Sequence, residues 1–260
     1  MLIVENLTIT ARMTHGTKTI VDGLSFSAPN GETLGIVGQS GCGKTMTALS
    51  MFGLLPENCL ASGSAVVGGV DTISMQEHSL TKLRGQKIVY MPQSGADFLN
   101  PSLRIKTHLF ETLHRLGVPR SLRNETALSL LRSAGFSEPD SIMSKYPFQL
   151  SGGMAQRVVL ALGMAGQPDL VIADEPTRGI DRSTAVAFIE MLKASFANSV
   201  LIIITHDISI ARLCDKLLVM HSGTLAEYGN AGDVIGNPVS EPTRQLIAAM
   251  PERWKLEDSG

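Results

Sequence analysis

One glycine-rich segment of the chain has the residue types and spacing of a phosphate-binding loop. It matches the pattern G-x-x-x-x-G-K-[ST], follows an apolar strand-like run at residues 33–37, and precedes a helical pattern at 46–55. Glycines let backbone N–H groups wrap around phosphate oxygens, and a helix that begins there adds a positive dipole end. We therefore expect the lysine to neutralise the outer phosphates of a nucleoside triphosphate and the threonine hydroxyl to ligate Mg²⁺. The segment consists of Gly38, Gln39, Ser40, Gly41, Cys42, Gly43, Lys44 and Thr45.

A second strand-like run ends in two carboxylates. Residues 170–173 are all apolar, and Asp174 and Glu175 follow them directly. In phosphate-binding α/β sheets, a neighbouring strand delivers its terminal acid to the nucleotide. We expect Asp174 to hold Mg²⁺ through water and Glu175 to act as general base toward the water that attacks the terminal phosphate. An acidic pair alone could be a solvated strand end, but the phosphate-binding loop favours the catalytic interpretation.

The elements that must position these residues alternate between strands and helices. Short strand-like runs at 2–4, 7–9 and 24–28 precede the loop, and an edge strand or hairpin follows it at 65–70. After residue 150 we expect helices at 153–165, 183–196 and 208–214, and strands at 170–173, 200–205 and 216–220. This alternation predicts a mostly parallel sheet with helices on both faces. Between about 107 and 144, apolar residues recur at helical spacing, which indicates a helical insert.

Composition and charge exclude several classes of protein. The 260 residues carry a net charge of −2 and scattered basic residues, so the sequence offers no electrostatic case for nucleic-acid binding. The strongest apolar run, 200–204, is far shorter than the roughly 20 residues that span a bilayer, so a membrane role would need a partner. The N-terminal residues do not predict a secretory signal. Cys42, Cys59 and Cys214 form no C-x-x-C pair, which argues against a disulfide framework or metal site and fits a reducing cytoplasm.

Residues 150–157 resemble the LSGGQ signature of the ABC-type ATPases. They read L-S-G-G-M-A-Q-R, which is most similar to the branch of oligopeptide, dipeptide and nickel importers. Residues 98–101 are similar to the S-L-N-P run of that branch, whereas 92 and 94–95 depart from its usual F-Q-D-P. The resemblance implies that the signature binds the terminal phosphate of an ATP held by a second subunit. The implied nucleotide-binding residues of the signature are Ser151, Gly152, Gly153 and Gln156.

The same resemblance assigns further residues to the nucleotide. Gln93 matches the glutamine of the Q-loop, which contacts Mg²⁺ and the attacking water. His206 matches the switch histidine, so Glu175, His206 and Gln93 form the implied catalytic set, and Thr45, Gln93 and Asp174 the implied metal set. Asp181 lies at the D-loop position and is expected to cross a dimer interface; it also suits the N-cap of the next helix. His15 lies where the family has an adenine-stacking aromatic residue, and a plain surface histidine is the equal alternative.

The resemblance also implies a fold and a division into domains. The fold is α/β, a P-loop NTPase with an ABC-type ATPase core, a helical subdomain and an N-terminal antiparallel β subdomain. Residues 1–93 and 149–230 would form the RecA-like ATP-binding core together with the antiparallel β subdomain. Residues 94–148 would form the helical subdomain that contacts a permease, and 231–260 a short C-terminal extension.

The implied function is an ATP-binding and hydrolysing subunit that powers an ABC importer for nickel, metal chelates or peptides, with ATP and Mg²⁺ as cofactors. Its implied partners are a second ABC ATPase subunit, a paralogue, in a head-to-tail dimer, two transmembrane permease subunits and, indirectly, an extracytoplasmic solute-binding protein. The chain would then lie peripherally on the cytoplasmic face of the cell membrane. A non-transport ABC ATPase is an alternative, but the single cassette without heptads or a basic surface argues against it. The importer-type run at 98–101 argues against the other alternative, an exporter cassette.

Overall fold

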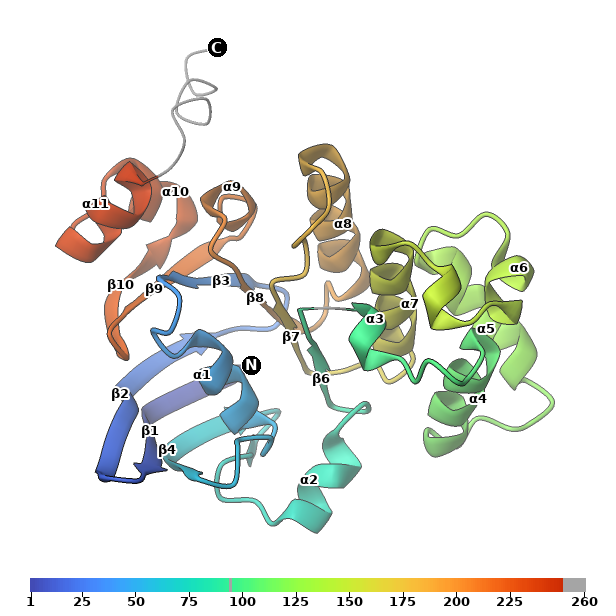
Figure 1. Cartoon of the computed structure of the whole chain (residues 1–260), viewed down its shortest axis with the longest axis horizontal. Helices are drawn as coiled ribbons and strands as arrows, with labels where there is room; N and C mark the ends of the chain where they lie inside the picture. Colours follow the sequence, from blue (N-terminus) through green and yellow to red (C-terminus); the bar gives the residue numbers. More distant parts are fainter. Residues whose placement is uncertain (94, 250–260) are drawn as a thin grey trace.

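The computed structural model describes residues 1–93 and 95–249. Residue 94 of the predicted helical insert and residues 250–260 of the predicted C-terminal extension lie outside the described residues. Within the described ranges, the chain forms a six-stranded sheet, a four-stranded sheet and a group of helices set to one side of both (Figure 1).

The six-stranded sheet carries the residues that sequence patterns assigned to catalysis. Its order is β10-β9-β3-β8-β7-β6, and every neighbouring pair is parallel except the hairpin of β9 and β10. The prediction of a mostly parallel sheet is therefore confirmed. Because the strands run in one direction, β3, β8 and β7 end at the same edge of the sheet. The strands are β3 (Thr33–Gly38), β6 (Ile88–Met91), β7 (Leu170–Asp174), β8 (Val200–Ile204), β9 (Lys216–His221) and β10 (Thr224–Asn230).

The four-stranded sheet is antiparallel and covers one face of the larger sheet. Its order is β2-β1-β4-β5, from β1 (Leu2–Met13), β2 (Gly16–Ala28), β4 (Cys59–Val67) and β5 (Val70–Asp71). The helix α1 (Lys44–Met51) lies with it in one buried apolar cluster against the central sheet. The sequence predicted two short strands where the structure has the single strand β1. Its pairing with β2 shifts register around Asn6, whose φ is 48°, and this irregularity interrupts the apolar pattern.

Helices cover the opposite face of the central sheet (Figure 1). Successive residues of each strand point to opposite faces, so Val171 and Ala173 pack against these helices and Leu170 and Ile172 pack against the antiparallel sheet. The expectation of helices on both faces of the central sheet is thus right for the face covered by these helices. The antiparallel sheet, rather than helices, covers most of the other face. These helices are α7 (Gly152–Met164), α8 (Arg182–Ser195), α9 (Ile208–Ala211), α10 (Ala231–Gly236) and α11 (Glu241–Ala248).

The helical insert packs around the side of α7. It contains α3 (Gly95–Phe98), α4 (Ile105–Arg115), α5 (Arg123–Ser133), α6 (Pro139–Ser144) and a 3₁₀ turn at Pro147–Gln149. The helix α2 (Glu77–Leu83) was not predicted, because Leu80 alone of its residues is buried and no apolar periodicity marks it. Of the helices described, none has the length and apolar character to cross a membrane.

Candidate functional site

The phosphate-binding loop joins β3 to α1, where the sequence predicted it. Gly43 is the N-cap of α1 and has φ of 103°, a conformation that L side chains rarely adopt. A Cβ atom there would also lie 2.8 Å from Cγ2 of Val21, so glycine is required for space as well. The Lys44 side chain is buried, and its Nζ donates hydrogen bonds to the carbonyl oxygens of Gly38 at 2.8 Å and Gln39 at 3.0 Å. These two hydrogen bonds hold the ammonium group of Lys44 against the backbone of the loop.

The end of β7 brings Asp174 to the start of α1. The expectation that this strand neighbours the strand of the phosphate-binding loop is wrong, because β8 lies between β3 and β7 and pairs with both. Thr45 Oγ1 donates a hydrogen bond to Asp174 Oδ2 at 2.8 Å, and the Tyr90 hydroxyl donates to the same oxygen at 3.1 Å. Asp174 as a whole is 4% exposed. Burial raises the pKa of Asp174 above its usual range, although the hydrogen bonds from Thr45 and Tyr90 oppose this effect. Burial and the neighbouring carboxylate also raise the pKa of Tyr90. A carboxylate beside a hydroxyl is a set of hard oxygen donors that suits Mg²⁺.

Glu175 and His206 form a contact pair next to this carboxylate. Glu175 has φ of 48°, and its N–H donates to the carbonyl oxygen of Ile204 at 2.8 Å, which ties the end of β7 to β8. Its Oε1 accepts from the backbone N–H of His206 at 3.1 Å and lies 2.7 Å from His206 Nδ1. A non-glycine residue in left-handed conformation is a strained arrangement that clusters at functional sites. The pair is suited to hold and orient a water molecule.

Gln93 follows β6 and contacts Arg178. With its amide oxygen turned toward Arg178, Gln93 accepts hydrogen bonds from Nε at 3.1 Å and from Nη1 of the guanidinium. The sequence analysis missed Arg178 because no pattern marks an isolated arginine after the acidic pair.

A cavity of about 500 Å³ collects these residues, and its size suits a bound small molecule. It unites the phosphate-binding loop, the acidic pair, Gln93 and His206, which lie far apart in the sequence. Ile20 and Met46, which the sequence analysis also missed, contribute apolar surface to the cavity. Its lining consists of Ile20, Ser40, Gly41, Gly43, Lys44, Thr45, Met46, Gln93, Asp174, Glu175, Arg178 and His206.

The signature segment lies at the start of α7. Ser151 is the N-cap, and its Oγ accepts a hydrogen bond from the N–H of Met154 at 3.3 Å. Ser151 and Gly152 are exposed, so the N-terminus of α7 is accessible to a ligand from outside the chain. Gly152 and Gln156 line a second cavity of about 750 Å³, which shares Asp174 with the first. Among the described residues, the buried Oε1 of Gln156 has no hydrogen-bond partner.

Seven of the predicted site residues line neither cavity: Gly38, Gln39 and Cys42 of the phosphate-binding loop, Ser151 and Gly153 of the signature, and Asp181 and His15. Asp181 is the N-cap of α8: its Oδ1 accepts from the N–H of Thr184 at 3.0 Å and from the hydroxyl of Ser183 at 2.6 Å, and these hydrogen bonds lower its pKa. His15 lies exposed in the turn between β1 and β2 and is not among the residues that line the cavity. Ile20 is the residue of β2 that lines it.

A phosphate-binding loop on one parallel strand, an acidic pair on another and a glycine-rich start of α7 beside a helical insert together define an ATP-binding cassette. A family model described as "ABC transporter" matches residues 21–178, more than half of the chain. The chain therefore belongs to the ABC transporter family and is an ATP-binding cassette with ATPase function.

Individual proteins similar to this chain support the same family assignment. The oligopeptide transport ATP-binding protein OppD of Escherichia coli is 39% identical over 96% of this chain and 76% of its own length. The metal-staphylopine import system ATP-binding protein CntD of Staphylococcus aureus is 34% identical over 95% of this chain and 92% of its own length. Among solved structures, the dimeric ATP-binding cassette MJ0796 bound to ADP and phosphate is 26% identical, with a TM-score of 0.77 over 89% of this chain and 99% of that one.

Proposed function

We propose that the chain is the ATP-hydrolysing subunit that powers a membrane importer for peptides or metal chelates, nickel complexes among them. The observation that carries this proposal is that Glu175 and His206 line the same cavity as Lys44 and Asp174. A cassette that only binds nucleotide would not need a carboxylate and an imidazole in contact beside the phosphate-binding loop. The two importer relatives described above support the choice of import and of cargo class.

Within this function, several of the candidate site residues have specific roles. Lys44 and the backbone N–H groups of residues 38–45 bind the outer phosphates of ATP, and His15 remains the candidate for contact with adenine. Thr45, Asp174 and Gln93 would hold Mg²⁺, and the 2.8 Å contact of Thr45 with the buried Asp174 supports this choice. When bound, the ion would neutralise charge on the phosphate oxygens.

Glu175 is the general base in this proposal. Its carboxylate accepts the proton of the attacking water, and Gln93 and His206 orient that water. The contact of 2.7 Å between Glu175 Oε1 and His206 Nδ1 keeps both groups beside the phosphate-binding loop. The helix macrodipole and the ammonium of Lys44 favour the negative charge that develops on the phosphoryl group.

A second cassette completes the site in this proposal. Ser151, Gly152 and Gly153 would contact an ATP held by a partner subunit, in a head-to-tail dimer with a paralogue. Gln156 would support the signature from within, and Asp181 would cross the same interface. The exposed N-terminus of α7 and the dimeric state of the cassette MJ0796 support this arrangement.

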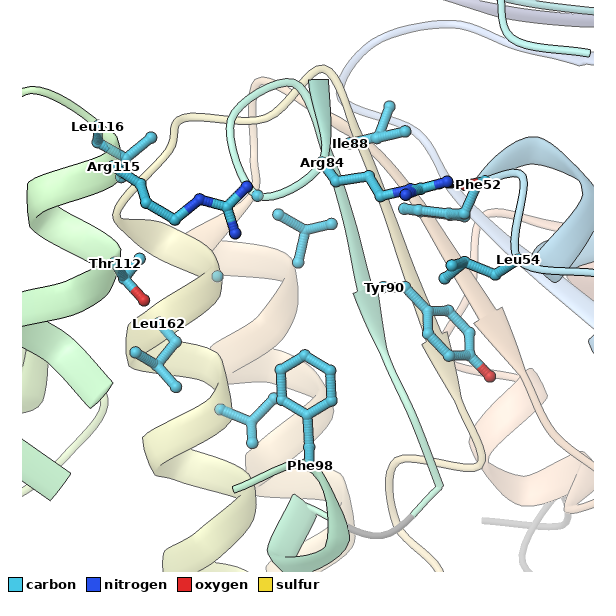
Figure 2. A pocket seen from close by; sticks show the side chains of 14 residues that line it. Phe52, Leu54, Arg84, Ile88, Tyr90, Phe98, Thr112, Arg115, Leu116 and Leu162 are labelled. Atoms are coloured by element: carbon cyan, nitrogen blue, oxygen red, sulfur yellow. Dashed lines mark hydrogen bonds between the residues drawn. The ribbon is translucent and has the colours of Figure 1, made fainter. Parts of the chain in front are cut away.

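The helical subdomain would contact the permease. Between it and the core lies a cavity of about 370 Å³ with largely apolar walls, which we term the apolar groove (Figure 2). Phe98 is 53% exposed and Leu54 is 44% exposed, so large apolar side chains of the groove remain available to a partner. We assign the groove to a short cytoplasmic helix of a transmembrane permease subunit. Its main apolar residues are Phe52, Leu54, Tyr90, Phe98, Leu116 and Leu162.

The domain limits follow from these assignments. Residues 1–93 and 149–230 form the ATP-binding core with the antiparallel β subdomain, 94–148 the helical subdomain, and 231–260 a C-terminal extension. Attachment to two permease subunits would hold the chain peripherally on the cytoplasmic face of the cell membrane. A solute-binding protein on the other side would deliver the cargo to those subunits.

Reconstitution of the importer tests this function. The complex with its permeases, partner cassette and binding protein is placed in lipid vesicles containing Mg-ATP, and uptake of a labelled peptide and of a nickel–metallophore complex is measured. We expect uptake of one cargo class with ATP consumption, and loss of both with Lys44→Ala, which removes the ammonium from the phosphate-binding loop. The matched control Lys82→Ala, on the exposed side of α2, should leave both rates unchanged. ATP consumption without uptake of any offered cargo would contradict the import proposal.

A further inference from the structure

Tyr90 belongs both to the apolar groove and to the site of Asp174. It lies on β6, the strand at the end of the central sheet, and pairs with Ile172 of β7. Its ring packs against that of Phe52 with 5.6 Å between ring centroids and an interplanar angle of 53°. The residue lines the groove and also the cavity that contains Gln93 and Asp174. Figure 2 shows Tyr90 on its strand beside Leu54 and Phe52.

The Tyr90 hydroxyl restricts how the Asp174 carboxylate can turn. It donates to Oδ2 at 3.1 Å, and Thr45 Oγ1 donates to the same oxygen at 2.8 Å. Two donors that reach one oxygen from different elements oppose rotation of the carboxylate about its Cβ–Cγ bond. Hydrogen bonds of this kind orient metal-binding carboxylates, and their loss typically weakens metal binding about 10–100-fold.

Resting on the function proposed above, we propose that Tyr90 is a positioning residue that couples occupation of the apolar groove to the metal-binding geometry of Asp174. A partner side chain that packs on the rings of Phe52 and Tyr90 limits the movement of Tyr90. Its hydroxyl then stays in place on Oδ2, and Asp174 keeps the orientation that binds the ion. Tyr90 lines the groove and donates directly to Asp174, whereas Gln93 is not among the residues that line the groove.

Thermodynamic linkage makes the coupling reciprocal. If a partner in the groove strengthens ion binding at Asp174 by a given factor, the bound ion strengthens partner binding by the same factor. The partner shifts the equilibrium only by the difference in its affinity for the two positions of Tyr90. The permease helix therefore binds more tightly to the cassette that holds Mg-ATP.

The variant Tyr90→Phe tests the hydroxyl alone, because the ring and its packing on Phe52 remain. Mn²⁺ serves as the spectroscopic probe of the metal site, in the purified chain with saturating ATP. We expect the Mn²⁺ dissociation constant to rise about tenfold in Tyr90→Phe, while ATP binding in EDTA changes less than twofold. The matched control is Tyr228→Phe, which removes a hydroxyl that donates to the Ser27 carbonyl oxygen at 2.6 Å and lies outside both cavities. It should match the wild type.

The coupling is measured by repeating the Mn²⁺ titration in the assembled complex. We expect the Mn²⁺ dissociation constant of the wild-type protein to be lower in the complex than in the free chain. The ratio of these two dissociation constants, free chain over complex, should be at least threefold smaller for Tyr90→Phe. Unchanged Mn²⁺ affinity in Tyr90→Phe, or an unchanged ratio, overturns the inference while leaving ATP hydrolysis intact as a function. A wild-type chain that binds neither ATP nor Mn²⁺ would instead refute the proposed function itself. Tyr90→Phe with weakened ATP binding in EDTA would indicate a general structural role and also overturn the inference.

Discussion

Replacing Glu175 with glutamine separates the chemical role of this residue from its structural one. Glutamine has nearly the same shape and can still accept the hydrogen bond that the His206 backbone N–H donates to Oε1 at 3.1 Å. It cannot take a proton from water. Loss of a general base typically costs about 10²–10⁴ in rate. We therefore expect ATP turnover of the assembled complex to fall by at least about two orders of magnitude, which corresponds to about 2.7 kcal/mol of transition-state stabilisation.

The cost in stability should be much smaller. The Glu175 side chain is 15% exposed, and the change replaces hydrogen bonds to a charged acceptor by hydrogen bonds to a neutral one. From the usual difference between such bonds, we expect the free energy of unfolding to fall by about 1 kcal/mol. Binding of Mg-ATP should remain within a few-fold of the wild-type affinity, because Lys44 and the phosphate-binding loop are unchanged.

The assay is steady-state phosphate release by the reconstituted complex, combined with equilibrium binding of ATP and urea unfolding of the isolated chain. The control Glu190→Gln makes the same chemical change on an exposed position of α8 and should keep wild-type turnover. Because Glu175 and His206 are in contact, His206→Ala added to Glu175→Gln should slow turnover by less than about threefold more. Turnover of Glu175→Gln within about fivefold of the wild type would refute the assignment of the base, and full additivity with His206→Ala would refute the contact pair as a catalytic unit.

Three further predictions address the signature, the core and the buried thiol. Ser151→Ala removes the N-cap of α7 and should lower the free energy of unfolding, measured with urea, by about 1 kcal/mol. The same variant should slow ATP turnover of the assembled complex at least about tenfold, and impaired ATP binding by the isolated chain would contradict a role toward the partner's nucleotide. Gly166→Ala would set a Cβ 2.1 Å from the Gly85 carbonyl oxygen and should destabilise the fold by about 1–3 kcal/mol or more in thermal unfolding, whereas Gly232→Ala meets no atom within 4 Å and should have little effect. Burial raises the pKa of Cys214 to about 12, so its thiol is neutral at pH 8; maleimide labelling followed by mass spectrometry should modify it only after unfolding, and rapid labelling of the native chain would contradict this burial.

Much of the fold could be predicted because its signals are local. The apolar strands β7 and β8 and the helix α7 are nearly as long as their patterns indicated, since each buries a face that its own sequence must supply. The short helix α2 escaped prediction because it buries only Leu80, and β1 was divided because of the irregularity at Asn6. In both cases the element depends on neighbours that a local pattern does not contain.

Some candidate site residues could also be predicted from local sequence, whereas others depend on distant parts of the structure or on a partner. Lys44 and Thr45 could be assigned from a contiguous motif, and Asp174 from its position at the end of an apolar strand. The roles of Ser151 and Asp181 toward a partner remain predictions, because they depend on the surface of a second chain. His15 also remains a prediction, and the structure places it in an exposed turn rather than in the lining of the cavity.

The amino-acid sequence by itself determined the chemistry, since a loop of eight consecutive residues and an acid at a strand end need only local order to form. Tertiary structure alone decided which distant groups meet. Thr45 and Asp174 are 129 positions apart, and Tyr90 and Asp174 are 84 positions apart. The Tyr90 contact exists because β6 lies beside β7 in a register that pairs Tyr90 with Ile172. The Thr45 contact exists because β3 and β7 flank β8 and end at the same edge of the sheet. Strand order and register arise from the packing of the whole sheet between its two covering layers, so the apolar periodicity of a single segment does not predict them.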